Sequence, residues 1–129
     1  MRVLIDTQIL LYAIYQQQKI PSAMQSRLSN PDNDILFSAV SIAEVAIKSS
    51  LGRSDFPYPP EEVADAARAM GFVELSLGAR AAIRLADLPW HHRDPFDRLL
   101  IAQTLEEGVR FVTTDRLLTR YSDLIELMS

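Results

Sequence analysis

The chain opens with Arg2-Val3-Leu4-Ile5-Asp6-Thr7, a short run of mostly branched apolar residues that stops at an acid and a hydroxyl residue. Such a run predicts a buried β-strand that ends in a polar loop. The residues that follow, Gln8 to Tyr15, have the pattern of a helix. The first fifteen residues therefore predict a strand followed by a helix.

The same alternation continues along the chain. Further strands are predicted over 35–37, 72–75 and 109–113, with a possible last strand over 124–127, and further helices over 22–29, 38–51, 60–70, 79–86, 95–107 and 115–121. Alternating strands and helices are typical of a parallel sheet covered on both faces. We therefore expect an α/β fold, a three-layer α/β/α sandwich with a central, mostly parallel sheet, in which ligands bind at the carboxyl ends of the strands.

Length and composition limit the function. With 129 residues and 48% hydrophobic residues, the sequence predicts a single globular domain over residues 1–129. The absence of cysteine excludes disulfides, thiolate metal sites and thiol catalysis. No targeting segment or membrane span is evident, so we expect a soluble, cytoplasmic protein. The net charge of −4 has the wrong sign for binding nucleic acid through bulk charge.

Four acids stand at strand ends or inside apolar stretches, where an unpaired charge is costly. They are Asp6, Glu44, Asp97 and Asp115. Each also has a purely structural explanation: Asp6 and Asp115 as helix caps, Glu44 as the i,i+4 partner of Lys48, and Asp97 as a first-turn acid. A single carboxylate cluster would explain all four together. Because such a cluster needs cations to stay ionised, it predicts a site for Mg²⁺ or Mn²⁺ that activates a water against a phosphodiester.

These acids stand in segments that resemble one family. The segments are Val3-Leu4-Ile5-Asp6-Thr7, the run from Ser38 to Glu44 with Lys48, Asp94-Pro95-Phe96-Asp97-Arg98-Leu99-Leu100-Ile101-Ala102-Gln103, and Thr113-Thr114-Asp115. Over essentially the whole chain this order resembles the PIN domain, and more closely the VapC-type toxins of bacterial toxin-antitoxin pairs. The segment that begins at Asp94 is the most specific.

The resemblance implies a metal-dependent endoribonuclease that cleaves RNA and that a small VapB-like antitoxin binds and blocks. It implies Asp6, Glu44 and Asp97 as the core ligands of Mg²⁺ or Mn²⁺, and Asp115 as a fourth, more peripheral acid. It also suggests a homodimer. The neighbouring hydroxyls of Thr7, Ser41 and Thr113 are candidates to support these acids. Asp94 is either a further ligand or, as we favour, a helix cap.

Basic and aromatic residues near the acids are candidate RNA contacts. The basic candidates are Lys48, Arg53, Arg93, Arg98 and Arg116. Trp90 and Tyr58 are able to stack on a base, although burial under a loop is the commoner fate of such rings. His91 and His92 are adjacent in a loop and make a poor metal pair, so we expect exposed loop residues there.

Two other functions remain open from the residues alone. An aspartyl-phosphate phosphotransfer domain would use Asp6 as its nucleophile, but Gln8 stands where a dehalogenase-like site needs a second Asp. A binding module with structural acids is the other. For the dimer, apolar residues of the first two helices offer either a contact surface or an ordinary core: Ile9, Leu10, Tyr12, Met24 and Leu28.

Overall fold

The computed structural model describes residues 1–52 and 56–129. Its sheet has five strands in the order β3-β2-β1-β4-β5, and every pairing between neighbours is parallel. The strands are β1 (Arg2–Ile5), β2 (Asp34–Ser38), β3 (Val73–Leu75), β4 (Arg110–Thr113) and β5 (Ile125–Leu127). The predicted α/β class is confirmed, and all the strands expected from the sequence, including the last, are present.

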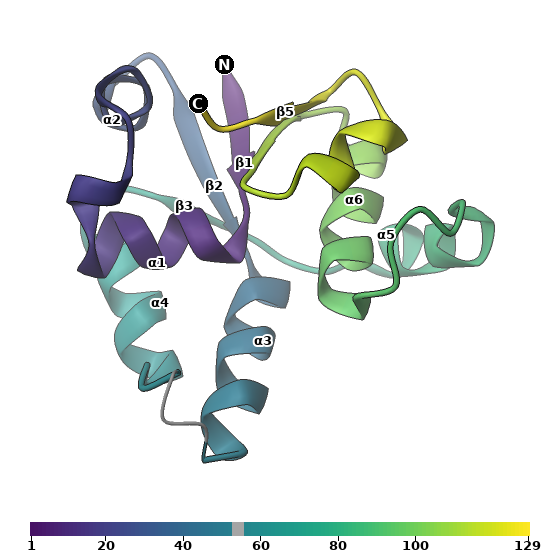
Figure 1. Ribbon diagram of the computed structural model, residues 1–129, viewed down its shortest axis with the longest axis horizontal. Coiled ribbons are helices and arrows are strands. Elements are labelled where there is room, and N and C mark those ends of the chain that lie inside the picture. The colour runs from purple at the N-terminus through teal and green to yellow at the C-terminus, as the bar shows by residue number, and fades with distance from the viewer. Residues whose placement is uncertain (53–55) are drawn as a thin grey trace.

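Helices cover both faces of this sheet, which gives the expected three layers (Figure 1). They are α1 (Thr7–Tyr15), α2 (Ser22–Ser29), α3 (Ala39–Ser50), α4 (Pro60–Ala69), α5 (Ala79–Arg84) and α6 (Pro95–Glu107), with the 3-10 helices η1 (Gln17–Lys19), η2 (Leu85–Asp87) and η3 (Arg116–Tyr121). The predicted helices lie within a few residues of these bounds. The helix expected over 115–121 is a 3-10 helix that begins one residue later.

The first strand is the centre of the hydrophobic core. Val3 and Ile5 contribute to the core under α1, α2 and α4, whereas Leu4 points to the opposite face and packs with residues of α6. All three side chains are fully buried. A continuous apolar run is what a strand buried on both faces requires.

The apolar residues considered for a dimer contact belong mainly to this core. Ile9, Leu10 and Met24 are buried, and Tyr12 and Leu28 are partly buried and pack against the same cluster. The ordinary-core interpretation is therefore correct for these residues. Tyr15, the last residue of α1, keeps 37% of its surface exposed.

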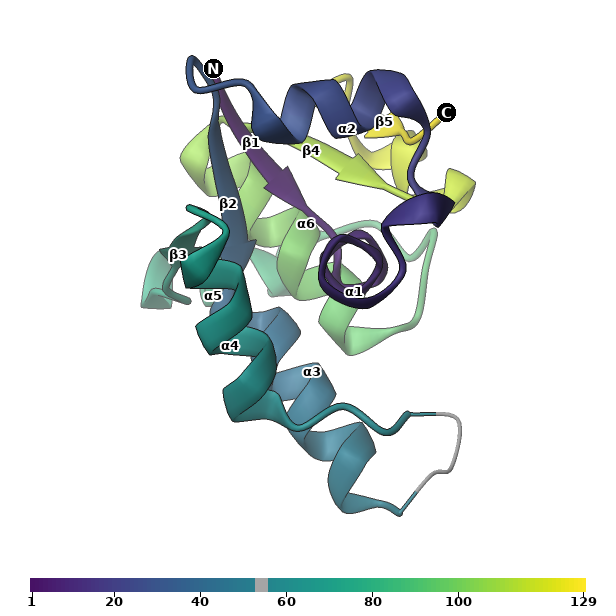
Figure 2. The same ribbon diagram turned by 90° about the vertical axis from the view of Figure 1, so that its left-hand side faces the viewer.

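The strand order places a switch point beside β1. The chain runs from β1 to β2 and β3 on one side, then crosses over to β4 and β5 on the other. In open parallel sheets such a point forms a crevice at the carboxyl ends of the strands, where ligands bind. Asp6 directly follows β1, and Asp115 lies two residues beyond β4. Figure 2 shows α3 and α4 extending past this edge of the sheet.

Within residues 1–52 and 56–129, no helix is long and apolar enough to cross a bilayer.

Candidate active site

Asp6 is the most firmly held acid at the carboxyl edge. Its Oδ1 accepts a hydrogen bond from the backbone N–H of Ile9 at 2.8 Å and so caps α1. Its Oδ2 accepts from the hydroxyl of Thr113 at 2.8 Å, and from the N–H and hydroxyl of Thr114 at 2.8 and 3.3 Å. Burial raises the pKa of Asp6, although these hydrogen bonds favour the charged form and oppose the rise.

Asp97 lies in the first turn of α6, where burial and several charged neighbours act on its carboxyl group. Burial and the charge of Asp94 raise the pKa of Asp97 to about 7; the charges of Glu44 and Asp6 act in the same direction, and His92 opposes them. Carboxylates on β1's end, α3 and α6 are therefore close enough to repel one another. The structure brings three of the four predicted acids together.

Asp94 has a structural role beside this cluster. Its Oδ1 accepts hydrogen bonds from the N–H groups of Phe96 and Asp97 at 2.8 and 3.2 Å, which makes it the N-cap of α6. This geometry agrees with the favoured interpretation of Asp94 as a cap.

Glu44 reaches the site from α3. The residue is buried, and its carboxylate forms an ion pair with Lys48 one turn along the helix. The structural explanation offered for Glu44 is thus present as well, but it coexists with the approach of Glu44 to Asp97. Lys48 neutralises part of the negative charge of the cluster. Its Nζ also lies 5.4 Å from the centroid of the Phe56 ring.

Asp115 joins the cluster through His92. Oδ1 of Asp115 accepts from the N–H of Leu117 at 2.9 Å and caps η3, while Oδ2 lies 2.9 Å from Nε2 of His92. The same Nε2 is 3.6 Å from Oδ2 of Asp97. His92 therefore links the two carboxylates. The expectation that His92 is an exposed loop residue is wrong. Its ring is packed between the carboxylates of Asp97 and Asp115, and no local sequence pattern indicates these contacts.

The hydrogen bonds of His92 also define its role. The N–H of Asp94 donates to Nδ1 at 3.1 Å, so Nδ1 carries no proton and the neutral ring must carry its proton on Nε2. One ligand atom from each of His92, Asp97 and Asp115 lies within 4.8 Å of the others, a spacing compatible with a metal ion. In this tautomer Nε2 donates a hydrogen bond to Asp115 and has no lone pair for a cation. The oxygen atoms of the acids are the available ligands.

The predicted hydroxyl residues have different places. Thr113 donates to Asp6 and its hydroxyl oxygen accepts from the N–H of Asp115 at 3.1 Å, so one side chain connects two acids. Thr7 donates to Ser41 at 2.8 Å, and this buried pair joins α1 to α3. Thr114 was missed by the sequence analysis. Its N–H contact with Asp6 depends on the pairing of β1 with β4, which no local pattern reveals.

The candidate basic contacts divide into exposed and buried side chains. Arg93 and Arg116 are exposed, Lys48 is partly buried, and Arg53 lies outside the described residues. Arg98 is buried, and its guanidinium donates to the carbonyl oxygens of Pro89 at 2.9 Å and Leu88 at 3.3 Å. The prediction that Arg98 contacts RNA phosphates is wrong, because its donors are used within the loop that precedes α6.

The two aromatic candidates also differ. Tyr58 is half-buried and packs against Tyr15, with 4.9 Å between the ring centroids. Trp90 is 76% exposed, which contradicts the expectation that a loop covers it.

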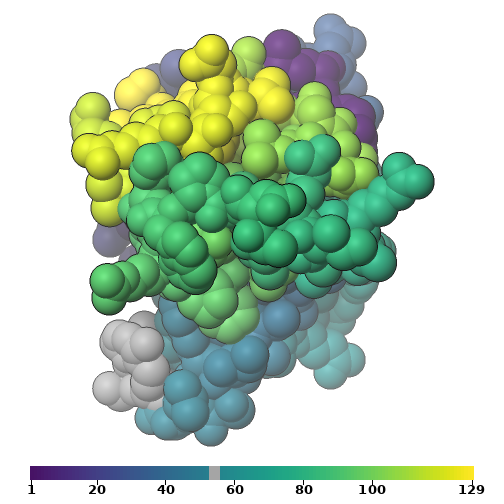
Figure 3. Space-filling model, turned by 90° about the vertical axis from the view of Figure 1, so that its right-hand side faces the viewer, coloured from purple at the N-terminus to yellow at the C-terminus, as the bar shows by residue number. Residues whose placement is uncertain are grey.

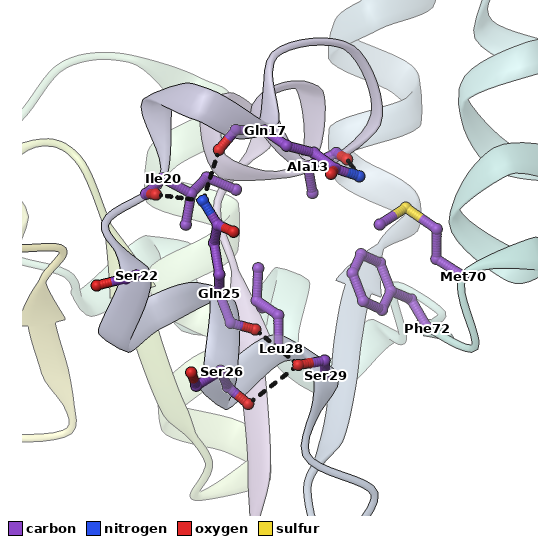
Figure 4. A pocket seen from close by; sticks show the side chains of 10 residues that line it. All are labelled: Ala13, Gln17, Ile20, Ser22, Gln25, Ser26, Leu28, Ser29, Met70 and Phe72. Carbon is purple, nitrogen blue, oxygen red and sulfur yellow. Dashed lines mark hydrogen bonds between the residues drawn. The ribbon is translucent and has the colours of Figure 1, made fainter.

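A separate hollow of about 450 Å³ lies away from the acids, between α1, α2 and the end of α4 (Figure 4). Gln25 crosses it and donates to the carbonyl oxygens of Gln17 at 3.0 Å and Ile20 at 2.7 Å, facing Met70 and Phe72. None of its ten lining residues is acidic. This hollow is therefore separate from the acids at the carboxyl edge of the sheet.

The donor set at the carboxyl edge suits a hard divalent cation. It consists of carboxylate oxygens, with hydroxyl and backbone N–H groups that orient them. Mg²⁺ and Mn²⁺ prefer oxygen ligands of this kind. A cation would also relieve the repulsion that raises the pKa of Asp97. Among the described residues, Asp97 and Asp115 lie with His92 at a spacing compatible with a metal ion, and the charges of Glu44 and Asp6 act on Asp97.

Comparison with known proteins agrees with this architecture. The family model for the PIN domain matches residues 3–124. Solved structures with the same fold include VapBC2 from Rickettsia felis bound to a DNA fragment from its promoter, with 18% identity, a TM-score of 0.71 and complete coverage of both chains. DNA-bound VapBC from Salmonella typhimurium has 17% identity and a TM-score of 0.71 over 100% of this chain and 99% of that one.

A third similar structure is VapBC-1 from nontypeable Haemophilus influenzae. It has 16% identity and a TM-score of 0.67, over 98% of this chain and 96% of that one. No curated protein matches the sequence. At these identities the structural likeness concerns the fold.

Proposed function

The chain belongs to the PIN-domain family, and on this premise we propose that it is a Mg²⁺- or Mn²⁺-dependent endoribonuclease. The observation that carries the proposal is the convergence of Asp6, Glu44 and Asp97 at the switch point of the sheet. Burial and the charge of Asp94 raise the pKa of Asp97 most, and the charges of Glu44 and Asp6 add to the rise. A perturbed carboxyl group among other acids supports a site where a cation neutralises the charge.

The protein's own residues prepare the site for that cation. Thr113 and Thr114 hold one oxygen of Asp6, and the cap of α1 holds the other, so this carboxylate loses little freedom on binding. Asp97 keeps a proton near neutral pH when no cation is bound, and this proton must leave as the cation enters. When bound, the cation supplies the positive charge that activates a water and stabilises the leaving oxygen of a phosphodiester.

The partners are part of the same proposal. Because the fold matches VapBC complexes, we assign the chain the role of the toxin, acting on RNA in the cytoplasm and blocked by a small VapB-like antitoxin. We also expect a homodimer. A monomer at micromolar concentration in analytical ultracentrifugation would contradict the dimer and leave the nuclease proposal in place.

Cleavage of RNA with and without metal tests the activity. Purified protein is incubated with structured RNA in Mg²⁺, Mn²⁺ or EDTA, and the products are separated on a denaturing gel. We expect cleavage in either metal, and none in EDTA or with Asp6→Asn. Cleavage that persists in EDTA would exclude the metal mechanism. Expression that arrests growth, and is relieved by a neighbouring small open reading frame, would support the toxin role.

The aspartyl-phosphate alternative stays less favoured for the reason that the sequence gives. A dehalogenase-like site needs a second Asp two residues after Asp6, and Gln8 stands there. A binding module with structural acids would not cleave RNA under any metal condition. The cleavage assay therefore distinguishes this alternative from the proposed nuclease.

A further inference from the structure

Trp90 is held in an unusual position beside the acids. Its side chain is 76% exposed, although an indole in water forgoes the free energy of burial. The guanidinium carbon of Arg98 lies 3.8 Å from the ring centroid, and Arg98 itself is only 4% exposed. One face of the indole is therefore covered by a buried cation, and the remaining surface is open to solvent.

The loop that carries the ring is fixed by hydrogen bonds. Arg98 donates to the carbonyl oxygen of Pro89 at 2.9 Å, and the hydroxyl of Tyr121 donates to the same oxygen at 2.8 Å. The hydroxyl oxygen of Tyr121 also accepts from the N–H of His92 at 2.9 Å. Because the ring is positioned before any ligand arrives, a ligand that stacks on it loses little free energy in ordering the protein.

The same contacts tie Trp90 to the candidate active site. Arg98 directly follows Asp97 in α6, and His92, two residues after Trp90, reaches both Asp97 and Asp115. Two residues of chain span at most about 7 Å. The segment between α5 and α6, in green, lies on the surface of the face drawn in Figure 3. The contacts of His92 and Arg98 therefore hold the loop that carries Trp90 beside the acids.

We propose that the free face of Trp90 stacks on an unpaired nucleobase next to the phosphodiester that is cleaved. This inference rests on the proposed ribonuclease function and narrows its substrate class to single-stranded RNA or unpaired loops. Bases inside a duplex are stacked on their neighbours and offer no free face, whereas unpaired bases stack readily on aromatic side chains.

Stacking also explains how a protein with a negative net charge would bind RNA. With a net charge of −4 the protein gains little from counterion release, so recognition of the bases has to supply affinity that bulk charge does not. Stacking on an aromatic ring needs no cation. Arg93, exposed and three residues along the chain from Trp90, offers a cation on the same loop for the phosphate of the stacked nucleotide. An aromatic ring for the base and a cation for the phosphate together match the two parts of a nucleotide.

Intrinsic fluorescence tests the proposal directly, because Trp90 is the single tryptophan of the chain. Wild-type protein is titrated with a single-stranded decamer of uridine and with a blunt RNA duplex of ten base pairs, in Ca²⁺ to limit cleavage, and a gel confirms that each RNA stays intact. Fluorescence anisotropy of the labelled RNA measures binding independently. We expect the decamer to quench the tryptophan emission by about half or more and the duplex to change it little.

Three variants complete the test. Trp90→Ala is expected to weaken binding of the decamer about 5- to 100-fold, and Trp90→Phe to retain most of the affinity, as stacking requires. Ile83→Ala removes another side chain, 68% exposed, from α5 and should leave the affinity unchanged. Thermal unfolding of each variant should match the wild type, since neither side chain is in the core.

The outcomes separate the two proposals. If wild-type protein cleaves RNA but the decamer leaves its emission unchanged, or Trp90→Ala binds as tightly as wild type, the stacking proposal is overturned and the nuclease stands. Equal quenching by duplex and single strand would overturn the substrate class. A protein that neither binds nor cleaves RNA in Mg²⁺ or Mn²⁺ would refute both.

Discussion

Asp97 and Asp115 are the same residue type at the same edge of the sheet, yet their surroundings differ. Asp97 is pressed by burial and by three other carboxylates, and its pKa rises to about 7. Asp115 is partly exposed, accepts a hydrogen bond from His92 and caps η3. We call Asp6, Glu44 and Asp97 the inner acids and Asp115 the outer acid. Gathering the inner acids lowers the stability of the folded protein, whereas hydrogen bonds stabilise the outer acid in its position.

The cost at Asp97 should appear as a dependence of stability on pH. Because the pKa of Asp97 is raised when the protein folds, the folded state binds its proton more tightly, and the free energy of unfolding falls as pH rises from about 4 to 7. A shift of this size corresponds to a loss of about 4 kcal/mol. We expect chemical denaturation in EDTA to show this fall in the wild type and a much smaller one in Asp97→Asn.

The control for that measurement is Asp123→Asn, which changes an exposed acid on the loop before β5. It should retain the full pH dependence. Mn²⁺ should reduce the dependence in the wild type, because the cation replaces the proton. A pH profile of Asp97→Asn identical to that of the wild type would show that the inner acids carry no strain.

Activity should separate inner from outer acids. Removing a ligand costs more than removing a group that only orients one, which itself costs about 10- to 100-fold. We therefore expect Asp6→Asn to lower the rate of RNA cleavage at least about 100-fold, and Asp115→Asn about 10-fold. Asp34→Asn, an exposed acid at the opposite end of β2, should be silent. Equal losses at Asp6 and Asp115 would remove the distinction between them.

Thr113 connects the two regions, so its hydroxyl should matter to both. Thr113→Val leaves the N–H of Asp115 without its partner and removes one of the three donors to Oδ2 of Asp6, at a cost of about 1 to 3 kcal/mol in the free energy of unfolding. The loss should grow as pH rises, because the ionised form of Asp6 needs the donor. Thr113→Ser keeps the hydroxyl, and a loss that grows with pH there too would contradict this explanation.

His92 should have a smaller effect than Asp6, since it positions Asp115 and lies beside Asp97 without being a predicted ligand. His92→Ala removes the donor to Asp115 and should lower the cleavage rate about 10-fold. His92→Gln can place an amide N–H near the position of Nε2 and should recover part of the rate. If both variants lose the same activity, the hydrogen bond to Asp115 is not the function of this ring.

Sequence patterns predicted the fold and singled out the inner acids as candidates for a clear reason. Alternating apolar strands and amphipathic helices are local patterns, and an acid at the end of a strand or within an apolar helix is conspicuous in the sequence, as with Asp6 and Glu44. It did not predict the contact of Thr114 with Asp6, the position of His92 between two acids, or the hydrogen bonds of Arg98 within its own loop. Each depends on contacts between segments that only the folded chain brings together.

The α/β class and the order of the elements follow from local periodicity, and the cost of burying an unpaired charge singled out four candidate acids. How these acids differ from one another depends on the folded chain. Burial, neighbouring charges and the hydrogen bonds of His92 set their energies, and these depend on distances across the sheet edge. The structure likewise decided that Arg98 lies beneath Trp90 and leaves its other face to solvent.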